Sequence, residues 1–231
     1  MQRILPRHMP PLRDEGPDAA HTILSDGTTA VLRTAQPADT DELQRFFARL
    51  TPAATRHRFF SESAPPAEVI RSLCDASHPE RSLTVIVLRR HDDTLRIIAS
   101  GSYHARTPQE AEVAMAVDEQ LHGHGLGTIL LERLALLAIR QGFTKLWAIT
   151  HADNLAMREV FATSGFTMEE HVEGGDMEVE LSLTPTDQSV RQSEWRERVA
   201  TIASLHPLFH PRTVAVIGAS LGGFYATWGA Q

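Results

Sequence analysis

The sequence of 231 residues lacks the features that mark secreted, membrane-spanning or nucleic-acid-binding proteins. Its single cysteine, Cys74, excludes an intramolecular disulfide and suits a reducing compartment. No apolar run approaches the roughly 18 residues of a membrane span, and residues 1–11 lack the apolar core of a signal peptide. A formal net charge of −7 argues against binding driven by phosphate neutralisation. We therefore expect a cytoplasmic protein that binds neither membranes nor nucleic acids.

The most informative stretch begins at Glu112 and runs through a glycine-spaced loop into an apolar helix. Small and apolar residues follow Glu112 and predict a strand. Gly123, Gly125 and Gly127 remove Cβ atoms where the following helix presents its unsatisfied N–H groups. These donors, with the positive end of the helix dipole, form a site for phosphate oxygens. The stretch therefore predicts a strand–loop–helix anion site.

Two nucleotide-binding alternatives fail on the residues present. The dinucleotide fingerprint needs G-x-G-x-x-G with an acidic residue about 20 positions later, but the spacing here is G-x-G-x-G and that acid is missing. The P-loop needs Lys-Ser or Lys-Thr after its last glycine, and Gly127 is followed by Thr128 and Ile129. Taken alone, the loop is also compatible with an ordinary glycine turn.

Two further motifs extend the pattern. The segment 120–125, Q-L-H-G-H-G, resembles the Q/R-x-x-G-x-G/A signature of the GNAT acetyltransferases. Downstream, residues 145–151 read as a short buried strand, Asn154 opens a helix, and Gly165-Phe166 closes it, which is similar to the second motif of that family. The resemblance covers roughly residues 22–183. It implies an α/β fold with a mixed central sheet and helices on both faces.

The resemblance implies acetyl-CoA as acetyl donor, with the loop amides on its pyrophosphate. The expected cofactor-binding residues are Val117, Gln120, Leu121, His122, Gly123, His124, Gly125, Leu126, Gly127, Thr128, Asn154, Met157 and Phe161. No metal is expected, because two histidines in a glycine loop without a clear third ligand fall short of a zinc site.

For the general base, the resemblance favours Glu112, with Glu110 two residues away as the competing carboxylate. Many relatives place a tyrosine where this chain has Phe161, which cannot protonate a leaving thiolate. Tyr103 is a distant alternative, and release of the thiolate directly or with a proton from water is another. His151 ends a strand and is expected to be structural rather than catalytic.

The residues before Glu112 predict the remaining elements. Asp26-Gly27 lies between two short apolar runs and indicates a hairpin, and Asp39 with Glu42 forms a capping-box pattern at the start of a helix over 40–50. Further helices are expected at 51–60 and 67–75, and strands at 82–88 and 95–103. This order of strands and helices along the chain resembles that of the GNAT fold.

The two ends of the chain differ from this domain, which we place at 21–183. Residues 1–20 are rich in proline and charge and are expected to be disordered, and 184–212 read as a linker. Residues 213–231 are similar to the first strand of the CoA-binding domain in NDP-forming acyl-CoA synthetases, and we expect only that truncated start here.

This pairing of domains resembles the Pat-type bacterial protein lysine acetyltransferases, and Thr51 to Phe60 resembles a segment of those proteins. The implied activity is acetyl transfer to a protein lysine Nε, with an acyl-CoA synthetase as the expected partner. Two alternatives remain open: an N-acetyltransferase acting on small-molecule amines, and a non-catalytic acyl-CoA sensor.

Overall fold

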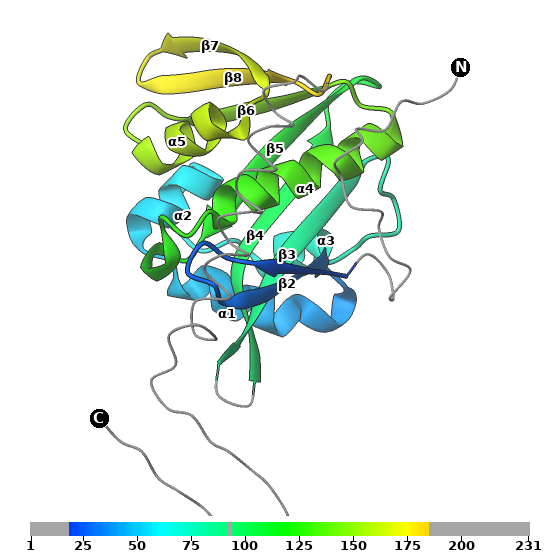
Figure 1. Ribbon diagram of the computed structural model, residues 1–231, viewed down its shortest axis with the longest axis vertical. Coiled ribbons are helices and arrows are strands. Elements are labelled where there is room, and N and C mark those ends of the chain that lie inside the picture. Colours follow the sequence, from blue (N-terminus) through cyan, green and yellow to red (C-terminus); the bar gives the residue numbers. More distant parts are fainter. Residues whose placement is uncertain (1–18, 92–93, 185–231) are drawn as a thin grey trace, which may run out of the picture.

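A single mixed sheet organises residues 19–91 and 94–184, which are the part of the chain that the computed structural model describes. The eight strands follow the order β1-β2-β3-β4-β5-β6-β8-β7, with helices on both faces (Figure 1). The segments predicted at the two ends, 1–20, 184–212 and 213–231, lie almost entirely outside the described residues and stay predictions.

The strands and helices follow one another along the chain in the order that the sequence predicts. The strands are β1 (Ala20–Ile23), β2 (Thr29–Thr34), β3 (Ser82–His91), β4 (Thr94–Ala105), β5 (Glu110–Val117), β6 (Lys145–His151), β7 (Thr167–Glu173) and β8 (Asp176–Ser182). The helices are α1 (Thr40–Arg49), α2 (Pro52–Phe59), α3 (Ala67–Leu73), α4 (Leu126–Gln141) and α5 (Leu155–Ser164), with short 3-10 turns η1 (Pro37–Asp39) and η2 (Glu119–Leu121).

All neighbouring strands pair antiparallel except β5 and β6. A parallel pair needs a long crossover, which α4 supplies. This confirms the α/β fold with a mixed sheet that the resemblance implied.

Each face of the sheet has its own apolar core, because strand side chains alternate between the two faces. On β3, Val85 and Val87 belong to the core under α4 and α5, whereas Ile86 belongs to the core under α1 and α3. Helix α4 buries one broad side, including Leu130 and Leu134, which are both fully buried. Gly142 ends this helix with a φ of 98°, as predicted.

The capping box predicted from Asp39 and Glu42 is wrong. Asp39 forms no side-chain cap on α1; its carboxylate accepts two hydrogen bonds from Arg33 of β2, at 2.6 and 2.7 Å, and one from the Gln36 amide. Glu42 instead accepts a hydrogen bond from Arg45, one turn further along α1. The guanidinium therefore takes the carboxylate that would otherwise have capped the helix.

Candidate active site

The functional region is built around a fork between β5 and β6. The two strands pair from Glu110 and Lys145 to Glu112 and Trp147, and their pairing ends there. Both strands nevertheless continue, β5 to Val117 and β6 beyond Trp147. Past the fork, the backbone groups of β5 that point toward β6 have no strand partner, and an extended ligand can satisfy them.

The loop after β5 has the conformation that its glycines predict. Asp118 caps the short turn η2, where its carboxylate accepts a hydrogen bond from the Gln120 amide at 3.1 Å. Gly123 and Gly125 then adopt left-handed φ values of 78° and 77°, and a Cβ at either position would meet nothing within 4 Å. Helix α4 begins directly after Gly125 without a side-chain cap. Its first N–H groups therefore have no side-chain cap among the described residues, as an anion site requires.

Gly127 serves a different purpose from the two glycines before it. A Cβ at this position would lie 2.6 Å from Cγ2 of Val160, so the missing side chain allows α4 to approach α5 closely. The side chains of Leu121 and Leu126 are buried in the core, as is that of Phe161 on α5. In contrast, the side chains of Gln120 and His122 are exposed.

The far side of the fork begins at Asn154, which opens α5 as predicted. Its side-chain oxygen accepts a hydrogen bond from the Met157 amide at 3.1 Å, and its amide nitrogen donates to Thr150 Oγ1 at 2.9 Å. These bonds fix the turn that joins β6 to α5. A direct contact of Asn154 or Met157 with the cofactor stays a prediction.

Glu112 is half-buried on the sheet face opposite to α4 and lies at the point where the fork opens. His104 lies directly across from it on β4. Glu110 shares this face but lies two residues back, within the paired part of the strands. The geometry therefore favours Glu112 over Glu110 as the carboxylate that reaches a ligand in the fork.

Arg58 of α2 is a second charged group close to Glu112. No sequence motif pointed to a role for it. Its Nη2 donates to Ser102 Oγ on β4 at 2.9 Å, and its buried Nε has no partner among the described residues. Burial lowers the pKa of Arg58 to about 10, while the negative charge of Glu112 opposes that shift. Arg58 thus stays charged at neutral pH and lies close to the proposed base.

Helix α2 connects the two sides of the fork. At its start, the Thr51 hydroxyl donates to the Glu119 carboxylate beside the glycine loop. At its other end, Arg56 and His57 contact the Asp153 carboxylate, each at 3.2 Å. The ring of Phe60, which follows the helix, lies 4.7 Å from the ring of His151.

His151 itself is held by Asp176 of β8, with Nδ1 2.9 Å from the carboxylate. Its Nε2 is buried and has no hydrogen-bond partner among the described residues. The sequence motif did not reveal this pair, because Asp176 lies 25 residues later and reaches His151 only through the pairing of β6 with β8.

Tyr103 and Cys74 both lie away from the fork. The Tyr103 hydroxyl donates to the Pro79 carbonyl at 2.7 Å, and the buried ring packs on the face of α4, opposite to Glu112. Burial also raises the pKa of Tyr103, so this residue is no proton donor for the fork. Cys74 is buried against α1, and burial raises its pKa.

Of the two histidines in the glycine loop, His124 has partners in the β1–β2 turn. His124 lies 3.6 Å from the Asp26 carboxylate in the β1–β2 turn, and its carbonyl accepts from the Ser25 amide. His122 is exposed. Within 19–91 and 94–184, no group of three or more potential ligands has the geometry to hold a metal ion.

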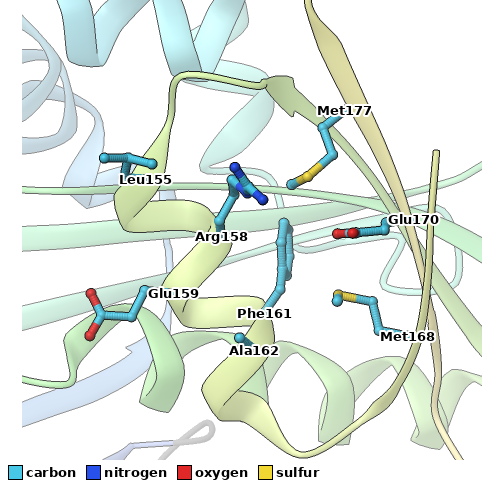
Figure 2. Close-up of a pocket in the computed structure, with 8 residues that line it drawn as sticks. All are labelled: Leu155, Arg158, Glu159, Phe161, Ala162, Met168, Glu170 and Met177. Carbon is cyan, nitrogen blue, oxygen red and sulfur yellow. The ribbon is translucent and has the colours of Figure 1, made fainter. Parts of the chain in front are cut away.

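A pocket of about 310 Å³ lies apart from the fork, between α5 and the β7–β8 hairpin (Figure 2). Leu155, Arg158 and Phe161 line it from α5, and Met168, Glu170 and Met177 line it from the hairpin. None of its lining residues belongs to the glycine loop or to α4. This pocket is therefore not the predicted pyrophosphate site.

The forked strands, the glycine loop and the carboxylate at the fork define a CoA-dependent acyltransferase. The sequence profile of the acetyltransferase (GNAT) family matches residues 44–166. Acetyltransferase PA5475 of Pseudomonas aeruginosa is 30% identical over 146 residues, which make up 62% of this chain and 77% of that protein. The chain belongs to the GNAT family and is an acetyl-CoA-dependent acetyltransferase.

Solved structures have the same fold. The GNAT domain of S. lividans PAT superposes with a TM-score of 0.64 at 24% identity and covers 71% of this chain and 96% of that one. The acetyltransferase yncA from Salmonella typhimurium, solved with its cofactor acetyl-CoA, gives a TM-score of 0.54 at 18% identity over 68% and 96% of the two chains. In the described part of our chain, no helix is long and apolar enough to cross a membrane.

Proposed function

We propose that this enzyme transfers the acetyl group of acetyl-CoA to the Nε of a lysine in a protein substrate, with Glu112 as general base. The observation that carries the proposal is the position of Glu112 at the opening of the fork. Its carboxylate lies on the face away from α4, whereas the anion site lies at the start of α4. A thioester held by the loop can therefore extend into the fork and meet an amine that arrives from the other face.

Each part of the site meets one need of the reaction. A lysine ammonium, with a pKa of about 10.4, has no lone pair and must lose a proton before it attacks. Glu112 accepts that proton, directly or through one water. The free N–H groups of β5 beyond Glu112 stabilise negative charge on the carbonyl oxygen. The glycine loop holds the pyrophosphate, and open space around Gly123 and Gly125 fits that role.

A cationic acceptor suits the charge of the face beside the fork. Pairing places Asp176, Glu178 and Glu180 of β8 on the same face as His151, Ile149 and Trp147 of β6. Glu178 is exposed, and the next strand, β7, continues this face with exposed Glu169 and His171. Glu180 is paired with Lys145 and Asp176 with His151, so Glu178 and Glu169 are the exposed carboxylates that favour a basic segment of a protein as acceptor.

The choice of an acyl-CoA synthetase as protein substrate rests on the resemblance to Pat-type enzymes. That resemblance includes the stretch from His210 to Ser220, which lies outside the described residues. The partner is therefore proposed from sequence, and the site geometry supports the reaction type.

The experiment is acetyl transfer from labelled acetyl-CoA to a purified acyl-CoA synthetase, followed by mass spectrometry of its lysines. Glu112→Gln should lower the rate by about 10²- to 10⁴-fold, equivalent to about 3–5 kcal/mol of barrier, because general-base catalysis is lost. Its affinity for acetyl-CoA, measured by calorimetry, should stay within twofold. Glu110→Gln is the matched control and should retain most of the activity.

Gly125→Phe gives the complementary result, since a large side chain at a left-handed position should block the anion site and abolish binding. Acetylation of one lysine that is lost with Glu112→Gln supports the proposal. Transfer to polyamines or amino acids but to no protein would favour a small-molecule acceptor. Tight binding of acetyl-CoA without transfer to any amine would favour a sensor.

A further inference from the structure

Among the described residues, neither Phe161 nor Tyr103 can give a proton to the departing CoA thiolate. Phe161 has no ionisable group and is 1% exposed within the core. The Tyr103 hydroxyl lies on the opposite face of the sheet and is bound to a carbonyl. A donor within the fork would be a buried titratable group whose polar atom has no hydrogen-bond partner among the described residues.

His151 meets that description. It is the last residue of β6 and lies four residues beyond Trp147, the last residue paired with β5. Four residues beyond Glu112 on β5 is Ala116, so Ala116 and His151 are at corresponding positions on the two sides of the fork. A thioester carbonyl that binds the free N–H groups of this part of β5 would lie at the level of His151.

The neighbours of the His151 imidazole hold it in one orientation. Asp176 lies 2.9 Å from Nδ1 and, by pairing there, leaves Nε2 as the atom available to a ligand. Nε2 is buried without a partner among the described residues, whereas buried polar atoms in proteins are nearly always hydrogen-bonded. The rings of Phe60 and His57 pack nearby, with centroids 4.7 and 5.7 Å from that of His151.

We propose that His151 is the general acid of this enzyme and that Asp176 is its positioning residue. The inference rests on acetyl transfer from acetyl-CoA, and it holds for any acceptor amine. The amine has first lost its ammonium proton through Glu112 to solvent. Its nitrogen then bonds to the carbonyl carbon, and Glu112 takes the second proton that the nitrogen loses. The carbon–sulfur bond breaks, its electron pair stays on sulfur, and the sulfur takes the proton of Nε2. Solvent then reprotonates His151 and removes the proton from Glu112.

The charged groups around His151 are compatible with this role. Asp176 on β8 lies against Nδ1 and holds the ring in place. Asp153, in the turn before α5, also attracts positive charge, but Arg56 and His57 of α2 already pair with it. His57 is the nearest competing histidine, and its Nε2 is engaged by Asp153 at 3.2 Å.

The direct test compares CoA with desulfo-CoA, which lacks only the sulfur. Histidine resonances of the whole protein, with His151 assigned through His151→Gln, are titrated by NMR in both complexes. If Nε2 donates to sulfur, the titration midpoint of His151 should differ between the two complexes by at least about half a pH unit, because a sulfur that accepts the Nε2 hydrogen bond favours the imidazolium and desulfo-CoA lacks that acceptor. Equal midpoints would overturn the inference, and this measurement requires no turnover.

Kinetics supply the second test. His151→Gln should lower kcat by about 100-fold or more and remove the basic limb of the pH profile, while KM for acetyl-CoA stays within twofold. Asp176→Asn should move that limb to lower pH. His21→Gln, an exposed histidine on β1 at the opposite edge of the sheet, is the matched control and should match the wild type. An unchanged basic limb in His151→Gln would contradict the role of His151, whereas failure to acetylate any protein would contradict only the proposed acceptor.

Discussion

The contact between Gly127 and Val160 gives the sharpest test of how the site is built. In Gly127→Ala, the added Cβ would lie 2.6 Å from Cγ2 of Val160, well inside van der Waals contact. Val160 is β-branched and strongly prefers one rotamer in a helix, so it cannot simply turn aside. Overpacking of this kind costs about 1–3 kcal/mol, and the higher helix propensity of alanine returns up to about 1 kcal/mol. We expect a net loss of stability of about 1 kcal/mol.

Urea unfolding of four proteins measures this effect: the wild type, Gly127→Ala, Val160→Ala and the double variant. Removing the valine methyl groups should make room for the new Cβ, so the double variant should be more stable than the sum of the single changes predicts, by about 1 kcal/mol. Gly125→Ala is the control. It is strained by a φ of 77° and has no neighbour within 4 Å, so Val160→Ala should not rescue it. If Gly127→Ala were as stable as the wild type, the close approach of α4 and α5 would be refuted.

Two further predictions concern charged groups. Burial raises the pKa of Asp39, but hydrogen bonds from Arg33 and the Gln36 amide outweigh it, so the folded-state pKa lies below the ordinary value. The pair of Asp39 and Arg33 therefore stabilises the fold above about pH 4, and this stabilisation is lost as the pH falls further. Asp39→Asn should lose about 1 kcal/mol at pH 7 and little at pH 2, in urea melts at both values. Arg58→Lys should unfold more easily at pH 7 and regain stability from about pH 8 upward, because a buried lysine sheds its proton below 10.4. Flat stability from pH 7 to 10, relative to the wild type, would contradict the burial of this charge.

The parts of the fold that depend on local pattern follow from the sequence. The glycine loop, the helix after it and the Asn154 cap were predicted because their residues act on their own backbone neighbours. Asp39 was misread because Arg33, on the preceding strand, takes its carboxylate. Gly127 fits a cofactor motif by sequence, but its contact with Val160 exists only once α5 packs on α4.

The charged residues around Glu112 were the least predictable part of the site. Arg58 lies in a segment that the resemblance included, but its approach to Glu112 depends on how α2 lies across β4 and β5. The pair of His151 and Asp176 likewise depends on strand register. Sequence therefore predicted the conformation of the glycine loop and of the turn at Asn154 better than the arrangement around Glu112, because each of the former is one continuous stretch and the latter joins separate elements.

The proposed placement of the two binding regions on opposite faces of the sheet has a kinetic consequence. In the proposed reaction the donor is held at the start of α4 and the acceptor amine reaches Glu112 from the side of α2, so the two molecules do not compete for space. Both can be bound at once, and the acetyl group passes between them without first residing on the protein. Initial rates measured against both substrates should therefore give intersecting rather than parallel double-reciprocal lines, and acetyl-CoA alone should leave no acetylated enzyme behind.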